Sequence, residues 1–182
     1  RGVGAAPLAG RLPVLAYGSN RCPSKITWLR RALGLGPDPV VVLRARTTGV
    51  AAVWAAGLRA RDGARPAVLA AAAGVVEEHA VWLATPHQIA VLDRCEGRDE
   101  RFRLARLRTG SVVVGGEVFD HAPARTAPAG SAPMAVDVPV ERPWVYLGRA
   151  EIRRPLLVDG APVRCADVPQ DVARTLSGET AA

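Results

Sequence analysis

Short apolar runs separated by Gly, Pro and charged residues recur along most of this chain, and no other feature constrains its fold as strongly. Such runs, rich in Val and Ala and bounded by turn residues, are typical of buried β-strands. The run 67–76 is rich in Ala, which also favours helix, but Gly74 interrupts it and Val flanks it, so we assign it as strand. The strands expected from this pattern are 13–17, 39–47, 48–60, 67–76, 78–84, 101–107 and 111–120.

Two helices are expected between these strands, and each has a start and a stop signal. The segment 23–33, PSKITWLRRAL, begins with proline, which is favoured at the first helical position, and is followed by glycine. The segment TPHQIAVLDRCEG offers Thr85 as N-cap, Pro86 at the first helical position and Gln88 as the partner in a capping box. Gly97 is a natural C-terminal stop.

Many strands with a few short helices predict an α+β fold, with a sheet that is closed or nearly closed. We expect a single domain over residues 12–176, with a short helix within 169–176. The stretches 1–11 and 177–182 are expected to be loose termini. The stretch 121–133 is rich in Pro, Ala and Gly and is expected to be a mobile loop.

The net charge of +7 raises the question of a nucleic-acid partner. The basic residues, which are all Arg apart from Lys25, are scattered along the chain in pairs at most. A nucleic-acid-binding segment usually gathers such residues into a block or stripe. We therefore expect no nucleic-acid partner, although a basic protein associated with RNA or DNA stays a third alternative for function.

The cysteines and histidines indicate neither a disulfide framework nor a metal site. The cysteines are three and widely spaced, without a CxxC pair: Cys22, Cys95 and Cys165. The histidines have no metal-ligand spacing: His79, His87 and His121. The apolar run 67–76 is much shorter than the roughly 20 residues of a membrane helix, and no signal peptide is visible. We expect a cytoplasmic protein without a metal, cofactor or membrane partner.

The segment VLAYGSN, residues 14–20, combines a strand, a glycine turn and an approaching helix start. Such a turn points backbone N–H groups at one place, which favours a carboxylate or a phosphate. The alternative is purely structural: Gly18 permits the turn and Asn20 caps a helix. Ser19 as a nucleophile in a strand–turn–helix elbow is a further alternative, but glycine is absent two positions either side and a base would have to be found.

Glu96 lies at the C-terminal end of the second expected helix, where the backbone carbonyls already carry partial negative charge. A carboxylate is unfavourable there, and a residue that breaks a local rule is a candidate for function. The alternative is an exposed Glu96 that pairs with Arg94, Arg98 or Arg101. Position alone does not separate the two interpretations.

YGSN near the N-terminus and LDRCEG before RFRLARL together resemble the γ-glutamylcyclotransferase-like superfamily, over residues 13–107. The resemblance implies a mixed α+β fold around a small β-barrel. It also implies an enzyme of intramolecular acyl transfer, in which a γ-glutamyl amine or peptide cyclises to 5-oxoproline and releases its amine. No metal, nucleotide or covalent intermediate is required by that chemistry.

Carried over residue by residue, the resemblance makes Glu96 the catalytic acid/base and Tyr146, in PWVYLG, a binding residue. This chain departs from the family pattern at Phe102, where the family frequently has a tyrosine. The side chain at this position therefore lacks the hydroxyl that could bind the substrate. The rival hypothesis is a non-catalytic member of the fold that binds a small acid or a protein. The implied substrate-binding strand and turn comprise Val14, Leu15, Ala16, Tyr17, Gly18, Ser19 and Asn20.

Overall fold

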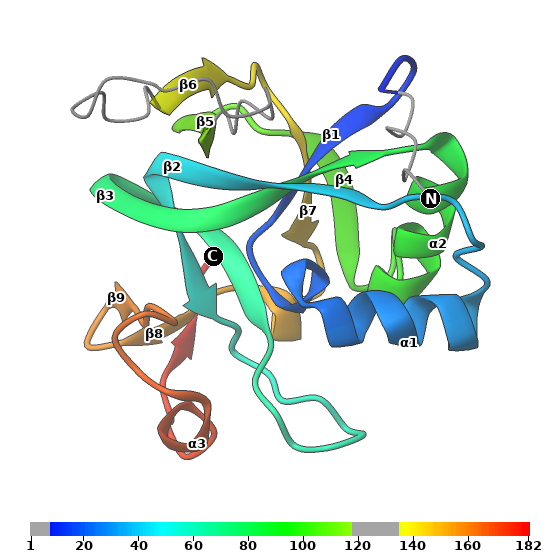
Figure 1. Cartoon of the computed structure of the whole chain (residues 1–182). Coiled ribbons are helices and arrows are strands. Elements are labelled where there is room, and N and C mark those ends of the chain that lie inside the picture. The colour runs from blue at the N-terminus through cyan, green and yellow to red at the C-terminus, as the bar shows by residue number, and fades with distance from the viewer. Residues whose placement is uncertain (1–7, 118–134) are drawn as a thin grey trace.

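The computed structural model describes residues 8–117 and 135–182 as a mixed α+β fold dominated by sheet (Figure 1). The strands in this part of the chain are β1 (Leu12–Ala16), β2 (Val41–Trp54), β3 (Ala67–Ala84), β4 (Phe102–Arg106), β5 (Ser111–Glu117), β6 (Ala135–Pro139), β7 (Trp144–Gly148), β8 (Leu156–Val158), β9 (Ala161–Pro162) and β10 (Glu179–Thr180). The helices are α1 (Pro23–Leu33), α2 (Pro86–Glu96) and α3 (Gln170–Ala173), with 3-10 turns η1 (Ser19–Arg21) and η2 (Glu151–Arg153).

The larger sheet has seven strands in the order β4-β7-β1-β3-β2-β5-β6. All neighbouring pairs are antiparallel except β1 and β7, which run parallel with Val14 opposite Trp144. Among the described strands, the two at the ends of this order, β4 and β6, do not pair with each other. The closed barrel that the resemblance implies is therefore not found in this part of the chain.

Two long strands replace four expected ones. The segments expected as 39–47 and 48–60 join into β2, and those expected as 67–76 and 78–84 join into β3. Their pairing shifts register between Thr48 and Val50, next to Gly49, whose φ is 84°. Glycine is suited to this left-handed conformation, so it permits an irregularity inside a strand where the sequence suggested a break between strands.

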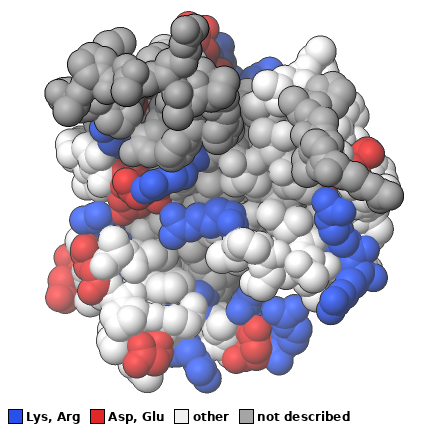
Figure 2. Space-filling model, viewed as in Figure 1, with Lys and Arg blue, Asp and Glu red and all other residues white. Residues whose placement is uncertain are grey.

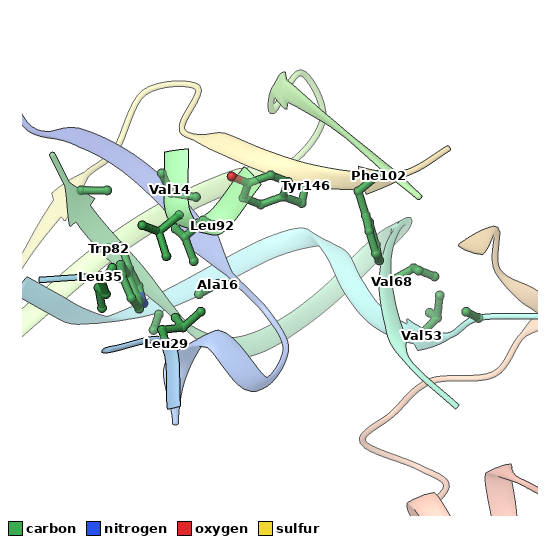
Figure 3. Packing of buried hydrophobic residues seen from close by; sticks show 14 of the residues in the cluster. Val14, Ala16, Leu29, Leu35, Val53, Val68, Trp82, Leu92, Phe102 and Tyr146 are labelled. Carbon is green, nitrogen blue, oxygen red and sulfur yellow. The ribbon is translucent and has the colours of Figure 1, made fainter. Parts of the chain in front are cut away.

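Alternating residues of the central strands bury two separate clusters, one on each face of the sheet. Val14 of β1 and Trp82 of β3 join one cluster, whereas their neighbours Leu15 and Val81 join the other. Figure 3 shows the first cluster, where Leu29 of α1 and Leu92 of α2 lie close to Trp82 and Val14. The helices thus cover one face, which explains why β1 is apolar without alternation.

The expected limits of both longer helices are confirmed. Gly34, after α1, and Gly97, after α2, have φ of 68° and 64° in the left-handed region. Thr85 and Gln88 form the expected capping box, in which each residue's side chain accepts from the other's backbone N–H. Within the described residues, no helix is both long and apolar enough to cross a membrane.

The C-terminal part differs from the expected loose tail. Residues 179–180 form β10, which pairs with β8 in a second sheet of three strands. Buried Arg65 holds this part against the rest, because its guanidinium donates to the carbonyls of Ala55, Ala56, Ala173 and Leu176. The expected loop 121–133 and residues 1–7 of the expected N-terminal tail lie outside the described residues.

A buried carboxylate lies beside the irregular part of the β2–β3 pair. The side chain of Glu77 is 8% exposed. Its Oε2 accepts a hydrogen bond of 2.8 Å from the Ala52 backbone N–H, and its Oε1 accepts one of 2.9 Å from Nη2 of Arg164. Glu77 therefore links β3 to β2 and to the segment that follows β9.

We expect Glu77→Gln to lower the free energy of unfolding by about 1–3 kcal/mol, the cost of a buried polar group left without its partner. The amide has one acceptor oxygen, so it cannot serve both Ala52 and Arg164. Urea denaturation measures the change. The matched control is Glu78→Gln, since the Glu78 side chain is 77% exposed and pairs with exposed Arg44. The control should change stability by no more than about 0.5 kcal/mol; equal effects of the two substitutions would refute this role of Glu77.

Stability should also depend on His79, a buried histidine whose pKa is lowered chiefly by burial. The neighbouring Glu77 carboxylate opposes this shift and the Arg21 charge adds to it. In the unfolded chain a histidine takes up its proton near pH 6.5, above the folded pKa. Below that pH the unfolded state binds more protons, so stability falls as the pH is lowered. Urea midpoints between pH 7.5 and 5.5 should fall less steeply in His79→Gln than in the wild type or in the exposed-site control His87→Gln.

Candidate active site

Sheet topology brings three segments to one edge of the larger sheet. Because β1 and β7 are parallel, their carboxyl ends point the same way. The strand β3 runs antiparallel to β1, so α2 starts at the opposite edge and returns along β1 (Figure 1). The end of α2 thereby meets the turn after β1, where Nδ2 of Asn20 donates to Oε1 of Glu96 over 2.8 Å.

A cavity of about 670 Å³ opens at this edge. It is lined by most of the residues that the sequence predicted, although they are up to 131 positions apart: Leu15, Ala16, Tyr17, Gly18, Ser19, Asn20, Glu96 and Tyr146. Val14 is the exception, because its side chain is buried in the core and does not line the cavity. The fold therefore brings together eight of the nine residues that the sequence indicated, and Val14 lies in the core beside them.

The carboxylate of Glu96 makes no ion pair within the described residues. The three arginines that could have paired with it are directed elsewhere. Arg98 pairs with Asp93 at 3.1 Å, and Arg94 donates to the carbonyl of Leu33. Arg101 donates to the backbone carbonyl of Glu96, over 3.1 Å, and to that of the preceding residue. The alternative expectation, in which an exposed Glu96 pairs with one of these arginines, is thus not found among the described residues.

Two tyrosines form a hydrogen-bonded wall beside Glu96. The Tyr17 hydroxyl donates to the backbone carbonyl of Tyr146 over 2.5 Å, and the Tyr146 hydroxyl donates to Oδ1 of Asp93 over 2.8 Å. Burial raises the pKa of both tyrosines, and the Glu96 charge adds to this shift. Both hydroxyls therefore keep their protons at neutral pH. They serve as hydrogen-bond donors that hold the two side chains in place, and neither is suited to act as a base.

The turn after β1 has three backbone N–H groups without a hydrogen-bond acceptor among the described residues. Gly18 has φ −120° and ψ −146°, outside the left-handed region, and a Cβ there would meet only the Cβ of Ala67 at 4.0 Å. The turn thus does not depend on glycine, contrary to the structural reading of the sequence. Within the described residues, the N–H groups of Gly18, Ser19 and Asn20 donate no backbone hydrogen bond. The Asn20 carbonyl is fixed by Nε1 of Trp82, at 2.9 Å.

Several lining residues were not predicted from the sequence. None of them belongs to a motif, and only Arg101 lies near one, the LDRCEG segment. These residues are Lys25 and Trp28 of α1, Leu58, Arg59 and Arg61 of the β2–β3 connection, Arg101, and Ile152 and Arg153 of η2. Among the described lining residues, Glu96 is the one carboxylate. The cavity therefore carries an excess of positive charge and suits an anionic ligand.

Two cysteines also line the cavity, and both are unsuited to nucleophilic attack. Burial, assisted by the Glu96 charge, raises the pKa of Cys95, and burial raises the pKa of Cys165 to about 12. The reactive form of a cysteine is the thiolate, which is scarce at neutral pH in both cases. No cluster of three His, Cys, Asp or Glu side chains suited to a metal occurs within residues 8–117 and 135–182.

The face of the molecule drawn in Figure 2 carries several groups of charged side chains. Figure 2 shows basic side chains separated by uncharged surface on the face in view, with acidic side chains beside several of them.

No protein-family model matches this chain, and no curated protein is found to be similar to it. The chemistry of the cavity is therefore the feature that indicates a function.

The Asn20–Glu96 contact can be tested by adding a second carboxylate. We expect Asn20→Asp to lower the free energy of unfolding at pH 7.5 by about 1–3 kcal/mol, because two carboxylates would lie within hydrogen-bonding distance. The loss should shrink at pH 5, where one proton can be shared between the two groups. Asn20→Ser, which adds no charge, is the control and should show a pH-independent loss. A loss from Asn20→Asp that does not vary with pH would contradict the contact.

Proposed function

We propose that this protein is a γ-glutamyl cyclotransferase, which cyclises a γ-glutamyl amine or peptide to 5-oxoproline and releases the amine. The observation that carries the proposal is the Glu96 carboxylate, which is oriented by Asn20, lacks an ion pair among the described residues and lines a cavity otherwise rich in cations. A base held in this way is what the cyclisation needs, because the attacking α-amine must first lose a proton.

The proposed reaction uses one carboxylate twice. Glu96 accepts a proton from the α-ammonium group, and the freed amine attacks the γ-carbonyl carbon. A carbon–nitrogen bond forms within the five-membered ring, and the bond to the leaving nitrogen breaks. Glu96 passes this proton to the leaving nitrogen, then takes the second proton that the ring nitrogen loses and passes it on in the same way. The ring nitrogen keeps one hydrogen, the amine leaves as an ammonium ion, and the carboxylate is regenerated without any other reactant. Holding amine and carbonyl together makes the attack intramolecular, which removes much of its entropic cost.

The turn after β1 is proposed to bind the glutamyl group. The N–H groups of Gly18, Ser19 and Asn20 can donate hydrogen bonds to the α-carboxylate or to the oxyanion that develops on the γ-carbonyl oxygen. The tyrosine wall would limit the positions open to the substrate, since Tyr17 and Tyr146 are fixed by their own hydrogen bonds. Closure of the sheet into a small barrel is not required, because β1, α2 and β7 supply these groups.

A covalent mechanism through Ser19 has less support. A serine nucleophile needs a nearby base, usually a histidine. No histidine is among the described residues that line the cavity. His79 is buried beside Glu77, 3.2 Å from its Oε2, and His87 contacts the Gly34 carbonyl at 3.0 Å. The third histidine, His121, lies outside the described residues.

The rival function is a non-catalytic protein that binds a small acid in the same cavity. Its support is the excess of positive charge in the lining, which would hold an acid whether or not a reaction follows. The two functions differ in what they require of Glu96: the enzyme needs a proton acceptor at this position, and the binding protein does not.

Glu96→Gln separates the two. The substitution keeps the shape of the side chain but removes its ability to take up a proton at neutral pH. We expect 5-oxoproline production from a panel of γ-glutamyl amines and peptides to fall by about 100-fold or more, the usual scale for a general base. Binding of γ-glutamyl compounds, measured by calorimetry, should survive.

The control is Glu100→Gln, which removes an exposed carboxylate four residues along. It should leave turnover unchanged. Full activity of Glu96→Gln would assign the proton transfer to another group. A wild-type protein that binds γ-glutamyl compounds but makes no 5-oxoproline from any of them would establish the rival function.

A further inference from the structure

Arg153 is a buried cation that has no partner anion in the part of the chain that the structure describes. Its residue exposure is 7%, yet it lines the cavity that contains Glu96. Its Nη1 donates to the Ile152 carbonyl over 3.2 Å. Within residues 8–117 and 135–182 no carboxylate lies within ion-pair distance of it. A desolvated guanidinium with five donors and one backbone acceptor is costly unless a ligand supplies the missing negative charge.

The other arginines of the lining are already engaged. Arg65 donates to four backbone carbonyls. Arg59 binds Asp62 through Nε and Nη2, each at 3.0 Å. Arg101 is engaged with the carbonyls at the end of α2. Arg61 pairs with Asp62 at 3.2 Å. Arg153 differs from these arginines in that it is buried and makes a single hydrogen bond among the described residues.

Close packing and hydrogen bonds hold the backbone of η2 in place, and this fixes the position of Arg153 in the cavity wall. A Cβ at Gly148 would lie 1.7 Å from the Arg153 carbonyl oxygen, so only glycine allows β7 to pack against this turn. On the other side, the Gly57 N–H donates to the Ile152 carbonyl over 3.0 Å and the Ala56 N–H donates to the Arg154 carbonyl over 2.8 Å.

The electrostatic surroundings of Arg153 favour an anion. Burial lowers its pKa, the Arg101 and Arg59 charges add to this shift, and the Glu96 charge opposes it. Arginine nevertheless stays charged in proteins. Two positive neighbours and one negative one leave a local excess of positive charge beside the proposed base, which an anionic group of the substrate would offset.

Exposed apolar side chains stand beside this cation. Ile152 is 51% exposed and Leu58 is 43% exposed, and both line the cavity. Gly57, which precedes Leu58 in the chain, packs against Ile152, because a Cβ at Gly57 would lie 2.4 Å from the Ile152 Cβ. This part of the cavity therefore offers a guanidinium next to an apolar surface, a combination that fits an apolar amino acid with a free carboxylate.

We propose that Arg153 binds a carboxylate on the leaving group, so that the substrate is the γ-glutamyl derivative of an apolar amino acid and not of a simple amine. This inference rests on the proposed function, in which Glu96 and the turn after β1 hold the glutamyl group. The leaving group then extends into the rest of the cavity, toward η2. Arg153 acts as a specificity-determining residue and takes no part in the proton transfer.

Two substrates that differ by one carboxylate test the proposal. γ-Glutamylphenylalanine and γ-glutamylphenethylamine share the glutamyl group and the aromatic ring. The wild type should prefer the acid by about tenfold or more in kcat/KM, as expected for hydrogen bonds to a charged group. Arg153→Gln should lose about tenfold or more on the acid, mainly through KM, and less than about threefold on the amine.

The matched control is Arg154→Gln, which removes an exposed arginine one residue along, outside the cavity lining. It should leave both substrates unchanged. Arg153→Lys keeps the charge without the planar fork, so it should show a smaller loss, again confined to the acid. Thermal melting verifies that each variant is folded. Equal losses on acid and amine would overturn the proposal and assign Arg153 to the α-carboxylate that both substrates share.

A binding measurement keeps the test independent of turnover. Calorimetry with N-acetylphenylalanine and with its neutral amide probes the same carboxylate without a γ-glutamyl group. The wild type should bind the acid more tightly than the amide by about tenfold, and Arg153→Gln should bind the two alike. Equal binding of acid and amide by the wild type would overturn the inference even if 5-oxoproline is formed. Selective binding without 5-oxoproline would retain the carboxylate site and reject the cyclotransferase.

Discussion

The parallel pairing of β1 with β7 is the constraint on which the candidate site depends. In an otherwise antiparallel sheet, it directs the carboxyl ends of two strands far apart in sequence to the same edge. The turn that follows β1 and the η2 turn that follows β7 are consequently on the same side. A purely antiparallel neighbour for β1 would have placed η2, and with it Arg153, at the opposite edge from Glu96.

The position of Glu96 is supported by the helix end rather than by pairing of its carboxylate. A negative charge at a helix C-terminus is unfavourable because the last carbonyls lack intrahelical donors. Arg101 supplies donors to two of these carbonyls. It can do so at close range because Gly97 has no side chain, and a Cβ there would lie 2.6 Å from Nε of Arg101. The arginine thus stabilises the helix end and leaves the carboxylate to Asn20.

Local signals in the sequence predicted most of the local structure, and they failed where distant contacts decide. The capping box at Thr85 and the glycine stops gave both longer helices their correct limits. Gly74 was a correct signal, because the Ala-rich run that it interrupts belongs to strand β3. The expected division between 39–47 and 48–60 was wrong, because the pairing of β2 with β3 continues past an irregularity at Gly49. The site followed the same division: the turn and Glu96 were marked by motifs, whereas Arg153 and Leu58 lie in segments without periodicity, and only the packing of η2 brings them to the cavity.

Two different residues are proposed to orient the Glu96 carboxylate and to bind an anionic group of the substrate. A single arginine could not serve both purposes. An arginine beside Glu96 would neutralise the carboxylate and lower its readiness to accept a proton, since an opposite charge favours the ionised form. Asn20 instead orients the carboxylate with a neutral amide, at 2.8 Å. Arg153 lines the same cavity without an ion pair to Glu96. In the proposed function, a carboxylate on the leaving group would offset the charge of Arg153, and the carboxylate of Glu96 would stay available for the proton transfer. The proposed specificity and the proposed reaction thus depend on the same distribution of charge.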